Sequence, residues 1–323
     1  MSNKSLMVSA NMDINSKDII NICRKTEEKN FNGIWFGETT LRDATALCTI
    51  ASLFTEKIQI GTSIVNVYTR SPGQLAMMGC TINEISGGRF TLGIGVSTPA
   101  IVTGWHGINY ENPLNRIEEV LKLLKLYFKG EKFEYKGKFF IIKNARLRLK
   151  TIPRIAVAAL NLKMIRIATR YADRIILNLY PVKLVKEAIK IIEEESAKIG
   201  KERPIVSVML YTYLLGKEDD DYDTIKELIA FYGSSEAYSN LFKRAGFVEE
   251  AKGMLNAWKI GNKEQAKKSV SINMIKELIA FENEKDLKGK MKLYYENGID
   301  DVFIAPSPFG KVLQNIDKIL SLF

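Results

Sequence analysis

A carboxylate stands where the chain leaves one of its short apolar segments. The stretch GETTLRD places Glu38 directly after the apolar run Gly33–Phe36. A carboxylate in such a position can donate or accept a proton, but an acid at the end of a strand can equally cap the helix that follows. These residues alone leave both roles open, and Glu38 is the first candidate for acid–base chemistry.

Histidine and cysteine chemistry has little material in this sequence. His106 is the only histidine, and it lies in the loop sequence GWHGINY, where a structural role is the favoured interpretation. Cys23, Cys48 and Cys80 lie far apart and form no CxxC pair. We therefore expect neither a disulfide framework nor a metal site.

Two further stretches have the small residues that let a backbone approach an anion. LGIGVST lacks both GxGxxG and GxxxxGK, so a tight turn between a strand and a helix is favoured over a phosphate loop. AALNLKM places Asn161 at an expected helix N-cap. Free N–H groups at such a helix start suit a phosphate, although an ordinary capped helix is the commoner case.

Short apolar runs alternate with amphipathic helical stretches along nearly the whole chain, which is the pattern of a parallel sheet built from βα units. Eight such units predict an α/β protein with a closed (β/α)8 (TIM) barrel, whose reacting groups lie at the C-terminal ends of the strands. The eight runs are Leu6–Ala10, Gly33–Phe36, Ile58–Ser63, Arg89–Gly93, Arg154–Ala158, Arg174–Leu177, Ile205–Leu210 and Asp301–Ala305.

Two segments interrupt this alternation. Residues 131–142 alternate apolar and polar side chains about a glycine, which predicts a small inserted β-hairpin. Residues 216–296 predict several helices inserted before the last strand, and they contain the acidic run Glu218–Asp221. No linker-like stretch marks the edges of this insertion, so we predict a single domain over 1–323, with a separate small helical domain as the alternative.

The composition is that of a globular protein: 46% of the 323 residues are hydrophobic and 26% are charged. The net charge of +10 raises the question of an anionic partner. The tightest basic cluster, Lys143–Arg154, has no interleaved aromatic residues, so a solvated segment is favoured over a nucleic-acid site. No stretch reaches the length that spans a membrane, and we expect a cytoplasmic protein without a membrane partner.

Four blocks of the chain resemble the luciferase-like monooxygenases, in particular the branch that uses the deazaflavin coenzyme F420 and includes methylenetetrahydromethanopterin reductases. The most specific block is GTSIVNVYTRSPGQLAMMGCTINEISGGRFTLGIG, over residues 61–95. The other three are residues 107–140, 153–178 and 294–308, in the family's order and spacing. The resemblance covers nearly the whole chain.

This resemblance implies where a cofactor would lie. It implies a non-prolyl cis peptide at Ser63–Ile64, in a bulge that supports the central ring of the flavin or deazaflavin. It favours Glu38 as the catalytic acid or base. By the same resemblance, the remaining cofactor-binding residues are Thr39 after the second strand, Thr62 at the end of the third, Val96 and Ser97 after the fourth, and Ala158, Ala159 and Asn161 at the phosphate site after the fifth.

The resemblance implies hydride transfer between coenzyme F420 and a small organic substrate, in a 5,10-methylenetetrahydromethanopterin reductase-like enzyme that forms a homodimer or homotetramer. An FMN-dependent monooxygenase and a non-catalytic flavin-binding relative are the alternatives. The chain departs from the family at Asn161 and Leu162, where Gly-Pro is frequent, and at Arg174, where Gly is frequent. Thr98 stands where relatives that oxidise sugar phosphates have a glutamate, which disfavours that activity.

Overall fold

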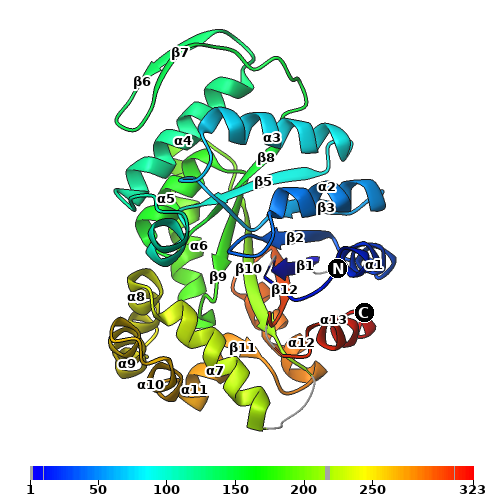
Figure 1. Ribbon diagram of the computed structural model, residues 1–323, viewed down its shortest axis with the longest axis vertical. Coiled ribbons are helices and arrows are strands. Elements are labelled where there is room, and N and C mark those ends of the chain that lie inside the picture. Colours follow the sequence, from blue (N-terminus) through cyan, green and yellow to red (C-terminus); the bar gives the residue numbers. More distant parts are fainter. Residues whose placement is uncertain (1–2, 10, 215–218, 309) are drawn as a thin grey trace.

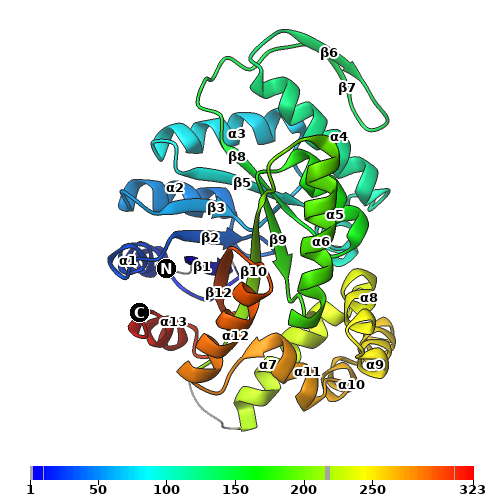
Figure 2. The same ribbon diagram turned by 180° about the vertical axis from the view of Figure 1, so that it is seen from behind.

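A closed barrel of parallel strands forms the centre of the molecule (Figures 1 and 2). The structure is a computed structural model that describes residues 3–9, 11–214, 219–308 and 310–323. Each of the eight barrel strands pairs with the barrel strand that comes before it in the chain. The last barrel strand pairs with the first and closes the barrel. In barrel order the strands are β1 (Asn3–Ser9), β2 (Gly33–Gly37), β3 (Gln59–Thr62), β5 (Phe90–Gly95), β8 (Arg154–Ala158), β9 (Arg174–Asn178), β10 (Ile205–Thr212) and β12 (Asp301–Pro306).

One helix follows each strand and packs on the outside of the barrel, as the alternating sequence pattern predicts. None of the helices among the described residues has the length and apolar character needed to cross a membrane. The helices of the outer ring are α1 (Ser16–Glu28), α2 (Ala44–Phe54), α3 (Pro72–Ile85), α4 (Pro113–Phe128), α5 (Leu162–Tyr171), α6 (Val182–Ile199), α12 (Glu284–Glu296) and α13 (Val312–Ser321).

The predicted barrel and all eight predicted strands are confirmed, with boundaries that differ by at most a few residues. Ala10, the expected end of the first strand, lies outside the described residues. Three short elements were not predicted: the strands β4 (Val65–Asn66) and β11 (Ile279–Ala280) and the π-helix η1 (Ala100–Trp105). Each is too short to leave a periodic pattern in the sequence.

The predicted hairpin is present as β6 (Phe133–Lys136) and β7 (Ile141–Ala145), which pair antiparallel and project from the barrel next to α4 (Figure 1). A two-stranded sheet is marginally stable by itself and needs a support to pack against. Buried Glu119 of α4 supplies it, because its carboxylate accepts hydrogen bonds from the backbone N–H groups of residues 138–140.

The predicted helical insertion is also present, and residues 216–218 at its expected start lie outside the described residues. Its helices pack on one another and share one continuous hydrophobic core with the barrel. α12 contacts α6 and β12, so residues 284–296 belong to the barrel and the insertion ends before them. The inserted helices are α7 (Asp219–Gly233), α8 (Glu236–Arg244), α9 (Val248–Lys259), α10 (Lys263–Lys268) and α11 (Ile272–Leu278).

A buried ion pair lies inside the barrel near the N-terminal ends of the strands. Arg174, the first residue of β9, contacts Asp301, the first residue of β12, at 2.9 Å between Nη1 and Oδ2. Its guanidinium also lies 5.0 Å from the ring centroid of Trp35. Burial raises the pKa of Asp301 and lowers that of Arg174, and the contact between them opposes both effects.

Glycine lets β3 and β5 approach closely beneath the mouth of the barrel. A Cβ atom at Gly93 would lie 1.8 Å from the carbonyl oxygen of Thr62, which is backbone and has no room to withdraw. The Thr62 hydroxyl meanwhile donates to the Gly93 carbonyl and accepts from its N–H. The contact therefore fixes the spacing of the two strands that carry the floor of the mouth.

We expect Gly93→Ala to lower the free energy of unfolding by about 3 kcal/mol, because strand backbone must shift to accept the methyl group. Gly289→Ala is the control, since a Cβ at this helical position would meet open space and alanine favours helices by about 1 kcal/mol. Urea unfolding followed by circular dichroism measures both. A Gly93→Ala protein as stable as wild type would show that the two strands separate freely.

Candidate active site

A cavity of about 330 Å³ opens at the C-terminal ends of the barrel strands, where enzymes of this fold place their chemistry. The strand ends provide its floor through Gly37, Ser63, Gly95 and Ala158, with Ile64 beside them. The peptide bond between Ser63 and Ile64 is cis, which confirms the expectation from the resemblance. We call this space the mouth cavity.

Hydrogen bonds hold the floor and the loop after β2 together. Ser63 donates its N–H to the Phe36 carbonyl at 2.7 Å, and Glu38 donates its N–H to the Ile64 carbonyl at 3.3 Å. Asn11 accepts from the N–H groups of Thr40 and Leu41 through one amide oxygen and so fixes the rest of that loop. The floor is thus a hydrogen-bonded unit built from three consecutive βα connections.

Glu38 forms a two-pronged ion pair with Arg70, which lies just before α3. The two contacts, from Nη1 to Oε1 and from Nη2 to Oε2, measure 2.6 and 2.8 Å, and both side chains are only 11–12% exposed. Burial lowers the pKa of Arg70, but its hydrogen bonds to Glu38 and the charge of this residue outweigh burial and raise the pKa. Glu38 Oε2 also accepts from the N–H of Ala44, the first residue of α2.

Local structure presents Arg70 to this carboxylate. Asn66 accepts hydrogen bonds from the N–H groups of Tyr68 and Thr69, which turns the chain after β4. Ser71 then caps α3, whose first residue is Pro72, a residue that suits the first turn of a helix. Arg70 lies between these two fixed points, so its guanidinium faces the loop after β2.

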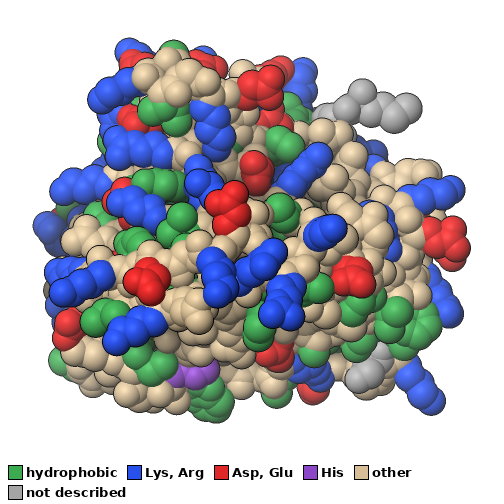
Figure 3. All heavy atoms as spheres, turned by 90° about the horizontal axis from the view of Figure 1, so that it is seen from above, with side chains coloured by type: hydrophobic (Ala, Val, Ile, Leu, Met, Phe, Trp, Pro, Cys, Tyr) green, Lys and Arg blue, Asp and Glu red, His purple; other side chains and the backbone are tan. Residues whose placement is uncertain are grey.

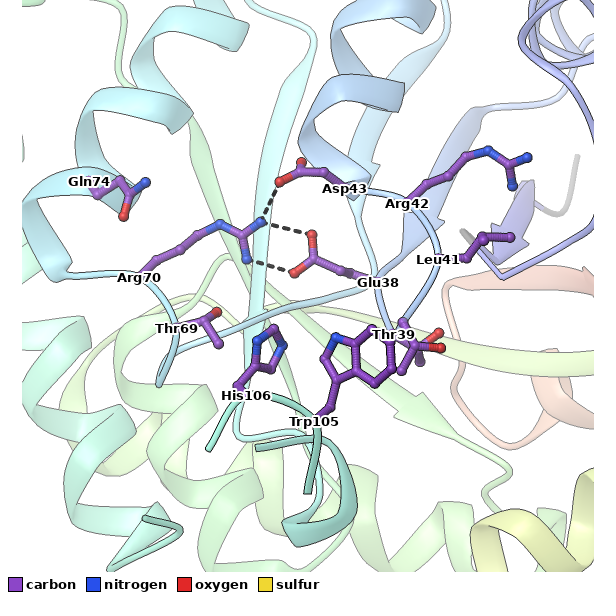
Figure 4. A pocket seen from close by; sticks show the side chains of 11 residues that line it. Glu38, Thr39, Leu41, Arg42, Asp43, Thr69, Arg70, Gln74, Trp105 and His106 are labelled. Atoms are coloured by element: carbon purple, nitrogen blue, oxygen red, sulfur yellow. Dashed lines mark hydrogen bonds and ion pairs between the residues drawn. The ribbon is translucent and has the colours of Figure 1, made fainter. Parts of the chain in front are cut away.

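A second, polar pocket of about 430 Å³ is lined by both members of the Glu38–Arg70 pair (Figure 4). Figure 4 shows the Arg70 guanidinium between Glu38 and Asp43, with Trp105 and His106 reaching in from the η1 segment. His106 thus lies in this pocket and outside the mouth cavity. Because two carboxylates share the charge of Arg70, the pocket is not set up to bind an anion through this residue.

Aromatic residues of the insertion cover the mouth cavity. Tyr232 of α7 and Tyr238 of α8 line it together with Phe231. Tyr232 shares a hydrogen bond of 2.5 Å with the hydroxyl of Tyr211, and Asn178 at the end of β9 donates to the hydroxyl of Tyr238. Burial raises the pKa of Tyr211, Tyr232 and Tyr238, so all three phenols stay protonated at neutral pH.

Three polar atoms at this cavity are buried without a hydrogen-bond partner among the described residues. They are the hydroxyls of Thr39 and Ser63 and the amide oxygen of Asn178. A buried polar group without a partner costs about 1–3 kcal/mol, so such atoms are expected where a ligand supplies the missing bond. Their common position at the mouth cavity indicates a polar ligand there.

The structure brings most of the predicted site residues together. Two predicted residues do not line the mouth cavity. Thr62 is fully buried with its hydroxyl bonded to Gly93, and the N–H of buried Ala159 donates to the Ile176 carbonyl. Asn161 caps α5 as predicted and also lines the cavity. The predicted residues that line it are Glu38, Thr39, Ser63, Ile64, Val96, Ser97, Ala158 and Asn161.

Sequence reasoning missed several residues of the site. Asn178 directly follows the predicted strand Arg174–Leu177 and is the last residue of β9, so the rule that strand ends carry function could have found it. Arg70 lies inside the block of residues 61–95, but nothing local reveals that its partner is Glu38. Tyr232 and Tyr238 come from the insertion, where helical periodicity does not show which face meets the barrel.

Comparison with known proteins identifies the family. The model of the luciferase-like monooxygenases matches residues 3–301. The chain belongs to the luciferase-like monooxygenase family. It is therefore an enzyme of the oxidoreductase class.

Individual relatives within this family narrow the comparison. The 5,10-methylenetetrahydromethanopterin reductase of Archaeoglobus fulgidus is 28% identical over 305 residues, which cover 90% of this chain and 91% of the relative. The structure of the coenzyme F420-dependent tetrahydromethanopterin reductase from Methanopyrus kandleri is similar with a TM-score of 0.83 at 22% identity, and the match covers 99% of this chain and 97% of that one.

A second solved structure, an F420-dependent secondary alcohol dehydrogenase in complex with an F420–acetone adduct, has a TM-score of 0.79 at 17% identity and covers 100% of this chain and 98% of that one. At these identities the two structural comparisons show that the fold is shared.

We expect Arg70→Lys to lower the free energy of unfolding by about 1–2 kcal/mol, because lysine cannot reproduce the two parallel hydrogen bonds to Glu38. The control is Lys25→Met, which breaks the ion pair with Asp317 between side chains that are 51% and 60% exposed and should cost less than about 1 kcal/mol. Denaturant unfolding compares the two. Equal losses would mean that the partly buried pair is no stronger than a surface pair.

Proposed function

We propose that the protein transfers a hydride between coenzyme F420 and an organic substrate in the mouth cavity, as a 5,10-methylenetetrahydromethanopterin reductase-like enzyme. The observation that carries this proposal is the cavity itself, with a floor of small side chains beside Ile64 and unpartnered hydroxyls at its edge. The named relatives that use F420 support the choice of cofactor.

The residues present fit a flat ring with polar edges. Gly37, Gly95 and Ala158 leave the strand ends free of bulky side chains, so a planar ring can lie against Ile64. The hydroxyls of Ser63 and Thr39 can then bond the polar edge of the ring. We place the phosphate of the cofactor beside Asn161, where the start of α5 presents backbone N–H groups.

F420, when bound, supplies the two-electron hydride chemistry of the reaction. The protein holds the ring against the strand ends and excludes water through the aromatic cover formed by Phe231, Tyr232 and Tyr238. The protonated phenols of this cover can donate hydrogen bonds to a substrate that lies above the ring. The covered floor thus orients both reactants in one small volume.

The proposal includes proton transfer by Glu38, and the hydrogen bonds of its carboxylate limit when this transfer can occur. Both carboxylate oxygens accept from Arg70, and one also accepts from the backbone of α2. These donors occupy the oxygens that a substrate would have to reach. Glu38 can therefore exchange a proton with a substrate only if its contact with Arg70 loosens in the complex.

A homodimer or homotetramer is proposed from the resemblance alone.

The first test is a titration of cofactor-free protein with F420 and, separately, with FMN, at fixed salt and followed by absorbance or calorimetry. We expect F420 to bind at least about tenfold more tightly than FMN. Ser63→Ala should weaken F420 binding about fivefold, the loss of one hydrogen bond of about 1 kcal/mol. Ser52→Ala, at a buried serine bonded to the Cys48 carbonyl, should leave binding unchanged. Tighter binding of FMN would move the protein to the FMN-dependent monooxygenases.

The second test is Glu38→Gln, read by oxidation of reduced F420 with methylenetetrahydromethanopterin across pH. If Glu38 transfers a proton, kcat should fall by about 100-fold or more and lose its pH dependence, while F420 binding changes little. Asp43→Asn is the control, because Asp43 also contacts Arg70 but does not line the mouth cavity. A Glu38→Gln enzyme with wild-type rates would remove Glu38 from proton transfer.

A further inference from the structure

The positive charge of the chain is concentrated in one segment. Residues 129–154 hold nine basic residues and two acidic ones, Glu131 and Glu134, so they contribute +7 to the net charge of +10. We call this segment the basic flank. It comprises the β6–β7 hairpin and the chain that leads to β8, and its basic residues are Lys129, Lys132, Lys136, Lys138, Lys143, Arg146, Arg148, Lys150 and Arg154.

All nine basic side chains are exposed, and none of them forms an ion pair within the described part of the chain. The neighbouring helix α5 behaves differently, since Arg166 and Arg170 both pair with Glu195. Figure 3 looks down on the face that carries the hairpin and shows Lys and Arg side chains over much of it. The flank therefore presents charge that the molecule itself does not neutralise.

The flank is held in place rather than loosely tethered. Glu119 binds the backbone of the hairpin, and the Tyr127 and Phe133 rings meet edge to face at 4.8 Å. A hollow of about 460 Å³ is lined by four of the cations, Lys129, Arg146, Arg148 and Lys150, together with the apolar side chains of Phe128, Leu149 and Ile152. Apolar side chains next to charged ones are a common feature of protein–protein interfaces.

Three kinds of ligand fit this face poorly. None of the nine cations lines the mouth cavity, so they do not contact a ligand held inside it. A second copy of the chain would bring the same positive charges together, which opposes self-association through this face. Phe139 and Phe140 are partly buried and their rings already contact the Arg116 guanidinium, at 5.5 and 5.4 Å, which disfavours stacking with nucleic-acid bases.

We propose that the basic flank is the docking surface for an acidic partner protein, whose carboxylates contact the unpaired cations and whose apolar side chain enters the hollow. Exposed Ile141 and Ile152, at 68% and 48%, provide apolar contacts beside the charges. Unpaired charges on one face accelerate encounter with an oppositely charged partner, and added salt weakens this effect. The proposal does not depend on which cofactor or substrate the mouth cavity takes.

The test measures binding of a fluorescent 20-residue poly-L-glutamate peptide by anisotropy at two salt concentrations. The flank variant replaces Lys129, Arg146, Arg148 and Lys150 with Gln, and the matched control replaces Lys57, Lys186, Lys259 and Lys285, four exposed lysines elsewhere that have no ion pair among the described residues. Wild type should bind the peptide, and the flank variant should lose at least about tenfold in affinity while the control stays within about twofold. Thermal unfolding confirms that both variants fold.

Several results would contradict the proposal. Equal losses in the two variants, or no binding by wild type at low salt, would show that the flank is an ordinary solvated surface. A 20-nucleotide RNA or vesicles with anionic lipid that bind wild type more tightly than the peptide, and lose binding in the flank variant, would assign the face to nucleic acid or membrane instead. Binding that does not weaken at the higher salt concentration would show that the unpaired cations do not carry it.

Discussion

The site depends on one contact, the two-pronged ion pair between Glu38 and Arg70. Glu38 belongs to the loop after β2 and Arg70 to the loop before α3, so the pair ties two βα units together at the barrel mouth. The planar guanidinium fits both carboxylate oxygens at once, and partial burial protects the contact from salt. If it opened, the wall shared by the mouth cavity and the polar pocket would lose its shape.

The two places where the chain departs from its family have different physical meanings. Arg174 replaces a frequent glycine but lies at the N-terminal end of the barrel, where Asp301 and Ser207 hold it against Trp35. It therefore takes no part in the mouth cavity. Asn161 replaces another frequent glycine and caps α5 through its own side chain. Neither departure removes the features that a cofactor would need, which weakens the case for a non-catalytic relative.

The sequence predicts the barrel well because its strands are continuous apolar runs, buried on both sides, such as Ile34–Phe36. It also predicts Asn161 as an N-cap, since capping depends on neighbouring residues only. Side-chain pairing is different, because Arg70 is 32 residues from Glu38 and no local pattern records their contact. The resemblance implies that Thr62 binds the cofactor, whereas its hydroxyl forms its bonds within the barrel. Roles carried over from a family thus depend on the direction of each group, which spacing in the sequence does not encode.

The floor and the cover of the mouth cavity come from separate parts of the chain. The floor consists of strand ends where even a methyl group has little room, as at Gly37 and Gly95. The cover comes from one inserted run of helices. Over evolutionary time, changes in these inserted helices can therefore alter which substrate is accepted, while the strand ends keep the proposed binding site for the cofactor. Divergence in substrate range does not require a new fold.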